Sequence, residues 1–364
     1  MKVICDRSAL SEALGATSGV IASRTPKPIL QCVRVTAEKD VLTLTAYDNE
    51  VGLRYRVKEV EVSKPGETLV SGDKLTQIVR ESSDDTLAFE LADGVLHVRG
   101  RDSHFQIFAQ DVREFPPVMD LEGAADFSVK CGALREAIER TVFAAARENT
   151  RYAINGVLWE KQGNKLALVA TDGRRLAISH ATLEKSTGGD AEAIVPTKAM
   201  SVFTRLHSDA EAVVQVKLAT NQVLLRTERA TISSVLVEGR FPKYSDVIPK
   251  DADKKIDVDT SDLLSAVKRA ALLTNEESKG IRIALNGEGM TFSSRAPETG
   301  EATVKLPIDY KQEPIEIGFN PAFLIDALKV CGEKTTLELQ SGSKPGVFRS
   351  GADFKYVVMP VNLS

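Results

Sequence analysis

The sequence contains few cysteines and no long hydrophobic run. The four cysteines are Cys5, Cys32, Cys131 and Cys331. They are far apart and form no C-x-x-C pair, so the sequence predicts neither a zinc ribbon nor a dithiol redox site, and buried free thiols are expected. No run of about eighteen apolar residues occurs, and charge at Lys2, Asp6 and Arg7 interrupts the N-terminal segment before a signal-peptide core can form. These absences predict a cytoplasmic protein.

Motifs of the common catalytic sites are also missing. There is no G-x-x-x-x-G-K-[ST] phosphate loop, no G-x-G-x-x-G fingerprint, no H-E-x-x-H and no G-x-S-x-G elbow. The four histidines are His97, His104, His180 and His207. Each is expected to stand alone, and acidic pairs such as Asp84 and Asp85 fall in turn-rich stretches where hydration accounts for them. No reaction, metal site or cofactor is predicted, and an enzyme with an unrecognised site stays an alternative.

The length and the average charge limit the classes of function. The chain has 364 residues and a mass of 39.5 kDa, which is more than one hydrophobic core usually organises. Hydrophobic residues make up 43% and charged residues 27%, as in globular proteins. The net charge is −4 and the pI is near 5.8. Because such a protein repels nucleic acid on average, contact with DNA requires an uneven distribution of charge.

One sequence pattern recurs at a constant spacing. Leu42–Ala46 has a counterpart in Leu166–Ala170 and a weaker one in Met290–Ser294; the segments begin at positions 42, 166 and 290, so each starts 124 residues after the one before. Internal repetition predicts similar domains in tandem. Polar stretches at 119–126 and 249–257 interrupt the pattern as linkers do. The predicted domains are 1–124, 125–252 and 253–364.

Each predicted domain has the order helix, strands, helix, strands. Apolar spacing predicts six helices, at 8–19, 72–82, 133–146, 197–207, 261–273 and 321–330. Ser261 or Asp262 is expected to cap the fifth helix, and Pro321 to open the sixth directly after Asn320. Alternating residues elsewhere predict antiparallel strands. The predicted fold class is α+β, with three tandem similar domains that each pack two helices on antiparallel sheets.

Positive charge is concentrated on the predicted helices. With the first extended to Arg7 and the third to Arg147, their basic residues are Arg7, Lys74, Arg80, Arg135, Arg140, Arg147, Lys198, Arg205, Lys268, Arg269 and Lys329. Their acidic residues are Glu12, Asp73, Glu81, Glu136, Glu139, Asp262 and Asp326. The helices thus carry +4, eleven minus seven, and the rest of the chain carries −8 to reach −4. Ordinary hydrated helix faces are one explanation. Repetition favours another, a single surface that contacts a polyanion through its phosphates without sequence specificity.

Several motifs, in order, resemble those of one known family. They are Pro28-Ile29-Leu30, Arg151-Tyr152, Asn155-Gly156, Ala170-Thr171-Asp172-Gly173-Arg174-Arg175-Leu176, Gly239-Arg240-Phe241-Pro242-Lys243-Tyr244, Ile317-Gly318-Phe319-Asn320 and Tyr356-Val357-Val358-Met359-Pro360. With this spacing the whole chain resembles the bacterial sliding clamp, the β subunit of DNA polymerase III. The resemblance implies the DNA clamp fold and a head-to-tail homodimeric ring. It implies a non-catalytic processivity factor that encircles double-stranded DNA without sequence specificity, in the cytoplasm at the nucleoid.

The resemblance also implies partners and site residues. The partners are the DNA polymerase III catalytic subunit, the clamp loader, other polymerases and mismatch-repair proteins, each bound through a short peptide motif; no membrane contact is implied. Positions that resemble DNA-contacting residues are Arg24, Arg80, Arg151, Tyr152, Lys198, Lys279 and Arg282. Positions that match a partner-peptide pocket between the second and third domains are Ile154, Thr171, Gly173, Arg174, Leu176, Pro242, Val247, Asn320, Phe323, Val357, Val358, Met359, Pro360 and Val361. Positions that match the subunit interface are Lys74, Phe105, Ile107, Phe108, Leu272, Leu273 and Glu298.

Simpler interpretations stay open for some of these residues. Tyr152 could be a packed aromatic at the start of a strand rather than a DNA contact. Leu176 and Val357 could belong to the core. Phe105 and Ile107 could also be core residues, because alternating apolar positions of a strand usually face inward.

Three residues depart from the family pattern. Ala153 and Phe323 stand where tyrosine is frequent, and Asp246 stands where arginine occurs. The peptide preference of the pocket is therefore not implied by the resemblance. Together with the net acidity, these departures keep an alternative function open, a peptide-binding scaffold or clamp paralogue that does not load on DNA.

Overall fold

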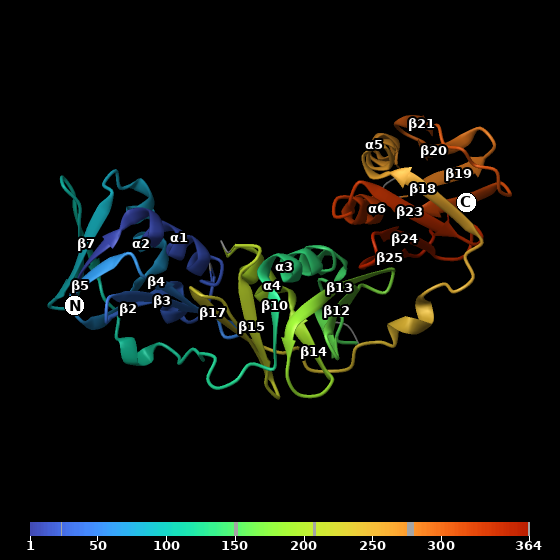
Figure 1. Ribbon diagram of the computed structural model, residues 1–364. Helices are drawn as coiled ribbons and strands as arrows, with labels where there is room; N and C mark the ends of the chain where they lie inside the picture. Colours follow the sequence, from blue (N-terminus) through green and yellow to red (C-terminus); the bar gives the residue numbers. More distant parts are fainter. Residues whose placement is uncertain (23, 149–151, 207–208, 275–279, 363–364) are drawn as a thin grey trace. The chain divides into compact units, whose positions relative to one another are not determined.

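The computed structural model describes residues 1–22, 24–148, 152–206, 209–274 and 280–362 (Figure 1). Its contacts define two compact units. Unit 1 comprises Met1–Arg135 and Leu183–Leu236, and unit 2 comprises Glu136–Thr182 and Val237–Ser364. In the part of the chain that the structure describes, no helix is both long and apolar enough to cross a membrane.

Unit 1 is dominated by strands. Its helices are α1 (Arg7–Ser18), η1 (Pro28–Gln31), α2 (Gly72–Glu81), η2 (Val112–Glu114), α4 (Thr197–Thr204) and the beginning of α3 (Cys131–Glu139). Its strands are β1 (Lys2–Asp6), β2 (Cys32–Glu38), β3 (Val41–Tyr47), β4 (Val51–Val57), β5 (Val60–Lys64), β6 (Gly66–Ser71), β7 (Thr86–Ala92), β8 (Val95–Arg99), β9 (His104–Phe108), β10 (Phe127–Lys130), β14 (Ala191–Pro196), β15 (Val213–Leu218), β16 (Gln222–Arg226) and β17 (Ala230–Val235).

These strands, β14 excepted, form two antiparallel sheets. One has the order β5-β1-β7-β8-β9, and the other runs β10-β15-β16-β17-β4-β3-β2-β6. In the second sheet β17 pairs with β4 in the register Ile232↔Leu53, and both residues are fully buried. Alternate residues therefore form a core face, against which α1 packs through β3 and β4. Figure 1 shows α1 and α2 close together over this sheet, and the two helices are in contact.

Capping residues close in sequence start the first two helices. Asp6 accepts a hydrogen bond at Oδ1 from the Ala9 N–H (2.8 Å) at the start of α1, and Ser71 Oγ accepts one from the Lys74 N–H (3.5 Å) at the start of α2. Arg80 lies exposed in the last turn of α2, where a cation is favourable beside the helix C-terminus. The two predicted helices are therefore present almost to the residue.

One carboxylate fixes the predicted linker at 119–126 to the larger sheet. Asp120 lies 2.7 Å from Arg56 Nη2 and 3.3 Å from Arg226 Nη2, and it accepts a hydrogen bond from Thr231 Oγ1 (2.9 Å). Burial alone would raise the pKa of Asp120, but the Thr231 hydrogen bond and the Arg56 charge outweigh it, so the pKa lies below its ordinary value. The carboxylate thus joins β4, β16 and β17 to the linker.

Unit 2 has the same mixture of elements. Its helices are the end of α3, η3 (Val142–Ala144), η4 (Tyr244–Val247), α5 (Thr260–Ala270), η5 (Ala271–Leu273) and α6 (Pro321–Leu328). Its strands are β11 (Gly156–Gln162), β12 (Lys165–Thr171), most of β13 (Arg175–Ser186), β18 (Lys254–Asp259), β19 (Ile281–Asn286), β20 (Gly289–Ala296), β21 (Gly300–Leu306), β22 (Ile315–Phe319), β23 (Lys334–Leu339), β24 (Gly346–Ser350) and β25 (Phe354–Val358).

Two antiparallel sheets also build unit 2. One runs β11-β12-β13-β25-β24-β23-β18, and the other has the order β21-β20-β19-β22. In Figure 1, α5 and α6 lie together against these strands, and the two helices are in contact. The C-terminal strand β25 lies in the sheet interior between β13 and β24, so the last described residues of the chain are held next to the β12–β13 turn.

Two details of the predicted helices are wrong. The helix predicted at 133–146 ends at Glu139 and is followed by the short η3, because Thr141 Oγ1 donates a hydrogen bond to the Ala137 carbonyl (2.8 Å) and the chain leaves the helical path there. The cap of α5 is Asp259 rather than Ser261 or Asp262; its Oδ1 accepts a hydrogen bond from the Ser261 N–H (3.1 Å).

The start of the sixth helix is as predicted. Pro321 is the first residue of α6, and Asn320 Oδ1 accepts a hydrogen bond from the Ala322 N–H (3.0 Å). Proline fits this position because its missing N–H would have no partner in the first turn. Asn320, a predicted pocket residue, therefore has a structural role as the cap of α6.

Candidate functional site

Hydrogen bonds from its own side chains fix the conformation of the turn between β12 and β13. Thr171 Oγ1 donates a hydrogen bond to the Arg175 carbonyl (2.6 Å) and accepts one from the Gly173 N–H (3.1 Å). Asp172 Oδ1 accepts hydrogen bonds from the Arg174 N–H (2.9 Å) and the Arg175 N–H (3.1 Å). Gly173 has φ +86°, a left-handed conformation that favours glycine. The turn therefore presents Gly173 and Arg174 to solvent from a rigid base.

Arg175 is a half-buried cation under this turn. Its guanidinium donates hydrogen bonds to Asp172 Oδ2 (3.1 Å), Asp326 Oδ2 (2.9 Å) and the Phe143 carbonyl (2.7 Å). Burial alone would lower the pKa of Arg175, but the hydrogen bond to Asp326 outweighs it, and the pKa lies above its ordinary value. Arg175 thus connects β13 to α6 and η3 as a permanent charge. The sequence interpretation missed this residue, although the doubled arginine of the quoted motif was a signal.

Phe323 of α6 lies against both arginines. The guanidinium carbon of Arg175 is 4.4 Å from the centre of its ring and that of Arg174 is 5.2 Å away, both within range of a cation–π interaction. Tyr356 on β25 donates a hydrogen bond from its hydroxyl to the Phe323 carbonyl (3.0 Å). The half-buried ring of Phe323 is therefore fixed from the sheet side.

The end of the chain passes along the same turn. The Met359 N–H donates a hydrogen bond to the Arg174 carbonyl (2.9 Å), and the Val361 N–H donates one to the Gly318 carbonyl (2.9 Å). Met359 leaves the sheet with 43% of its surface exposed. A flexible, polarisable thioether thus lies beside Arg174 on a fixed backbone, which suits contact with varied apolar side chains.

The predicted pocket residues divide between core and surface. Leu176, Val357 and Val358 are at most 2% exposed. These three residues belong to the core beneath the surface. For Leu176 and Val357 a core position was the simpler interpretation of the sequence. The half-buried or exposed members are Gly173, Arg174, Pro242, Val247, Asn320, Phe323, Met359, Pro360 and Val361. Ile154 and Thr171 are buried close to the surface, at 7% and 8%.

The short helix η4 carries Val247, which is 50% exposed. Tyr244, at the start of η4, donates a hydrogen bond from its hydroxyl to Glu160 on β11. Burial and this hydrogen bond raise the pKa of Tyr244, so it stays protonated and keeps donating at neutral pH. The pair fixes η4 to the sheet. This contact joins positions 84 residues apart, which explains why the sequence did not reveal it.

The predicted DNA-contacting residues differ in how free their charges are. Arg24 and Arg80 are exposed, and Tyr152 is 49% exposed. Lys198, in the first turn of α4, forms an ion pair with Asp48 in the β3–β4 turn, and Arg282 lies 2.8 Å from Glu316. Those two charges are already compensated in part. Arg151 and Lys279 lie outside the described residues.

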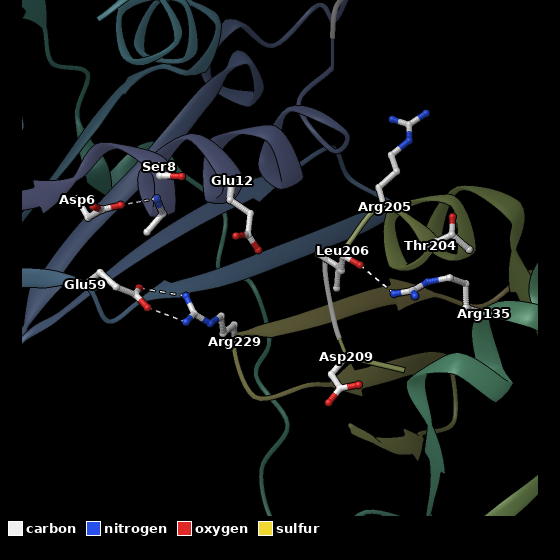
Figure 2. Close-up of a pocket in the computed structure, with 11 residues that line it drawn as sticks. Asp6, Ser8, Glu12, Glu59, Arg135, Thr204, Arg205, Leu206, Asp209 and Arg229 are labelled. Carbon is white, nitrogen blue, oxygen red and sulfur yellow. Dashed lines mark hydrogen bonds and ion pairs between the residues drawn. The ribbon is translucent and has the colours of Figure 1, made fainter. Parts of the chain in front are cut away.

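A cavity of about 960 Å³ lies in unit 1 between α1 and the end of α4 (Figure 2). The hydroxyl of Tyr55 donates a hydrogen bond to Glu12 (2.6 Å), and Arg229 donates one to Glu59 (2.6 Å). Arg135 donates to the Leu206 carbonyl (3.0 Å). Figure 2 shows Arg205 extending away from these groups. The lining therefore contains arginines together with carboxylates that already accept hydrogen bonds. Its most accessible cation is Arg205, which the sequence analysis counted among the basic residues of the helices.

The predicted interface residues lie on two sheet edges. Strand β9 is the last strand of its sheet in unit 1; Phe105 is 40% and Phe108 76% exposed, whereas Ile107 is only 8% exposed. In unit 2, η5 packs against β20 and the edge strand β21 and exposes 78% of Leu272. Leu273 is half-buried, and Lys74 and Glu298 are exposed. Ile107 faces the core, as the simpler interpretation allowed, whereas Phe105, two residues earlier on the same face of the strand, is exposed.

Three family models match the chain in order. Their descriptions are DNA polymerase III beta subunit, N-terminal domain (residues 1–120), central domain (128–243) and C-terminal domain (245–362). The beta sliding clamps of Pseudomonas putida and Vibrio cholerae are 34% and 32% identical, with 100% of both chains covered in each comparison. A crystal structure of a sliding clamp from Pseudomonas aeruginosa, bound to griselimycin, matches at a TM-score of 0.94 and 33% identity over 100% of both chains. The DNA polymerase III beta subunit of Thermotoga maritima matches at 0.91 and 25%, again over 100% of both chains.

Proposed function

Because the chain belongs to the family of DNA polymerase III beta subunits, the beta sliding clamps, we propose that two copies close into a ring around double-stranded DNA and hold the polymerase through a peptide-binding surface. The chain has the three-domain DNA clamp fold and functions as a sliding clamp in DNA replication, as an accessory subunit of DNA polymerase III. The predicted family, fold class and function are thereby confirmed. The whole-length match of the three family models, in chain order, is the observation that carries the proposal.

The finer organisation belongs to the proposal. We place the domain boundaries at 1–124, 125–252 and 253–364, supported by the 124-residue repeat. The chain acts without catalysing a reaction, in the bacterial cytoplasm where chromosomal DNA lies. Besides the polymerase, the clamp loader, other polymerases and mismatch-repair proteins use the same peptide-binding surface.

Contact with DNA uses scattered cations rather than a deep site. Arg24 and Arg80 are exposed and contribute the main contacts. Weaker contacts come from Tyr152, Lys198 and Arg282, together with Arg151 and Lys279. Such contacts bind phosphates without reading the sequence, and their affinity falls steeply with salt. Topology, not affinity, then keeps the protein on DNA while it slides.

The topological part of the proposal predicts a difference between circular and linear DNA. Protein loaded by a clamp loader on a nicked circle is expected to stay bound through gel filtration at a salt concentration that weakens phosphate contacts. Cutting the circle once with a restriction enzyme opens an end, and the protein is expected to be lost within minutes. Equal retention on the cut and uncut DNA would exclude an encircling ring and favour a protein that binds DNA from one side or a scaffold that does not load.

A second prediction concerns the ion pair between Asp48 and Lys198. Asp48→Asn removes the counter-charge while its amide oxygen can still accept the N–H groups of Glu50 and Val51. The freed lysine is expected to tighten DNA binding about two- to fivefold at low salt, and to steepen the slope of log K against log salt by about 0.9. The measurement is fluorescence anisotropy with a short duplex over a range of salt concentrations.

Glu50→Gln is the matched control for that variant. It removes the same charge from the same β3–β4 turn and leaves the contact between Asp48 and Lys198 in place. If both variants raise the affinity equally, the effect comes from net charge and Lys198 is not a DNA contact.

The peptide-binding surface consists of Arg174, Val247, Phe323 and Met359 above their buried supports. This surface suits a short extended peptide with apolar anchors. It combines the exposed cation of Arg174 with an aromatic ring, an aliphatic side chain and an adaptable thioether. Phe323 in place of the frequent tyrosine has no hydroxyl, so this side chain offers a bound peptide no hydrogen-bonding group.

The subunit contact is assigned to β9 of one copy and η5 of the other. Phe108 and Leu272 are the most exposed large apolar residues on these two edges, at 76% and 78%, and unpaired edge strands are a common route to association. The expected solution mass is about 79 kDa, twice 39.5 kDa. Leu272→Asp is expected to weaken the dimer at least about tenfold, because it places a charge in an apolar contact.

Sedimentation equilibrium measures this change directly. Val235→Asp, which alters another exposed apolar side chain, should leave the dimer intact. A monomeric wild-type protein, or a Leu272→Asp variant as tightly dimeric as the wild type, would remove the assignment of η5 to the interface.

A further inference from the structure

Two of the four histidines are in contact, contrary to the expectation that each stands alone. His97 lies on β8 and His104 on β9, and the distance from His97 Nδ1 to His104 Nε2 is 2.9 Å. The ring centres are 5.2 Å apart with 23° between the planes. In the register of the two strands His97 is opposite Gln106 and His104 is opposite Arg99, so the histidines are diagonal neighbours on one face. The hairpin brings together residues that are seven positions apart.

The pair lies on the outer face of the β8–β9 hairpin, at the edge of its sheet. Leu96 and Val98 of β8 point to the opposite face and are fully buried, which places the histidines on the side away from the core. His104 is exposed and His97 is half-buried. A small ion can therefore reach both rings from solvent.

Charged side chains of both signs surround the pair. Arg99 is opposite His104, Glu90 on β7 is opposite His97, and Lys2 on β1 lies 3.8 Å from Glu90. Partial loss of hydration, followed by the charges of Arg99 and His97, lowers the pKa of His104. Across the 2.9 Å contact, one ring donates a single N–H to a nitrogen lone pair of the other.

The spacing of the two nitrogens suits metal coordination. Bonds from imidazole nitrogen to a divalent transition metal are about 2.0–2.1 Å long. Two such bonds at a right angle, as in the tetragonal geometry of Cu²⁺ and Ni²⁺, place the nitrogens about 2.9 Å apart, whereas a tetrahedral angle requires about 3.3–3.4 Å. The observed separation of 2.9 Å therefore matches adjacent ligands of a tetragonal ion.

We propose that His97 and His104 form a two-imidazole binding site for a divalent transition metal ion, with Cu²⁺ bound most tightly. Within the described ranges no group of three or more His, Cys, Asp or Glu side chains suits a metal ion, so the two imidazoles are the protein ligands and water completes the coordination. On binding, the hydrogen shared between the rings moves through solvent to the far nitrogen of its own ring. Both contact nitrogens then donate lone pairs, and no proton is lost at neutral pH.

Binding connects β8 to the edge strand β9. The site exists only when the hairpin is folded, so the metal stabilises this edge by mass action; at a free concentration of about one hundred times Kd, the open population falls about a hundredfold. Both histidines come from one chain, so the site needs no residue of a second copy, although β9 also carries the proposed subunit contact at Phe108.

The test is a titration of the full-length protein with CuCl₂ at pH 7.4, followed by calorimetry and electron paramagnetic resonance. His97→Gln and His104→Gln are each expected to weaken the site at least about tenfold, and the wild-type spectrum should show two equivalent imidazole nitrogens. His180→Gln is the matched control, since His180 is an exposed histidine on β13; its affinity should equal that of the wild type.

The pH dependence gives an independent readout. Binding should weaken steeply below about pH 6, where two protons compete with the metal for the rings. Unchanged affinity in His97→Gln or His104→Gln, or a spectrum with a single imidazole nitrogen, would overturn the proposal.

Discussion

Arg175→Met is expected to lower the free energy of unfolding by about 2–3 kcal/mol, because partly buried charged groups lose their hydrogen-bond donor. Methionine keeps the length of the side chain but leaves Asp172, Asp326 and the Phe143 carbonyl without their guanidinium donor. Asp172 is 12% exposed in its side chain, so water cannot fully replace the lost hydrogen bond. We expect unit 2 to become much less stable.

A single tryptophan makes this measurable. Trp159 is fully buried in β11, within the same unit as Arg175, so its fluorescence during urea unfolding reports on the region where the ion pairs lie. The midpoint for Arg175→Met should move to a clearly lower urea concentration.

Arg174→Met is the matched control. Its guanidinium lies over the same Phe323 ring, at 5.2 Å, but the side chain is exposed. Loss of an exposed cation–π contact is expected to change the stability by less than about 1 kcal/mol. If the two variants unfold at the same urea concentration, the three hydrogen bonds of the Arg175 guanidinium do not stabilise unit 2.

Deleting residues 359–364 is expected to weaken polymerase binding at least about a hundredfold, which is about 2.8 kcal/mol. The deletion removes the exposed Met359 side chain and the two main-chain hydrogen bonds that run from Met359 to Arg174 and from Val361 to Gly318. Strand β25 ends at Val358, so the sheet itself keeps all of its residues. The expected result is a dimer that slides on DNA and no longer holds the polymerase.

Surface plasmon resonance with the immobilised polymerase subunit measures the loss, and sedimentation shows that the dimer persists. Met359→Ala removes the side chain but keeps the main-chain hydrogen bond to Arg174. This variant should weaken polymerase binding about tenfold. Met119→Ala is its control, because Met119 is another exposed methionine, in unit 1. Polymerase affinity that survives the deletion would place the partner site elsewhere on the chain.

Helix starts and turns were predictable because their causes are local. Asp6 and Asn320 accept hydrogen bonds from N–H groups two or three residues later, and the Thr171–Arg175 turn is closed by its own side chains. Such contacts need only a few consecutive residues, so the residue types and their spacing indicate them. The early end of α3 was missed because a threonine hydroxyl competes with the helix there, which apolar spacing does not reveal.

The candidate site was predictable only as a set of positions. The family resemblance identified Arg174, Phe323 and Met359. It did not show that Arg175 is the half-buried connection beneath them, nor that Val358 supports the surface from the core.

The predicted excess of positive charge on the helices is wrong for the six α-helices that the structure describes. They carry seven basic and seven acidic residues, because α3, α4 and α6 end before Arg140, Arg147, Arg205 and Lys329. The count also could not show that Asp48 neutralises Lys198 across 150 positions of sequence. The register of the sheet strands decides which residues so far apart in sequence become neighbours.

The sequence by itself determined the threefold repetition, the mixed helix and strand content and the family, because these depend on periodicity and on motifs that are read along the chain. Tertiary structure alone decided which charges are free and which are engaged, and which apolar residues are surface and which are support. The physical reason is that burial and ion pairing depend on distances between strands and helices that are remote in sequence. His97 and His104 illustrate it: two unremarkable residues become one site when a hairpin sets them 2.9 Å apart.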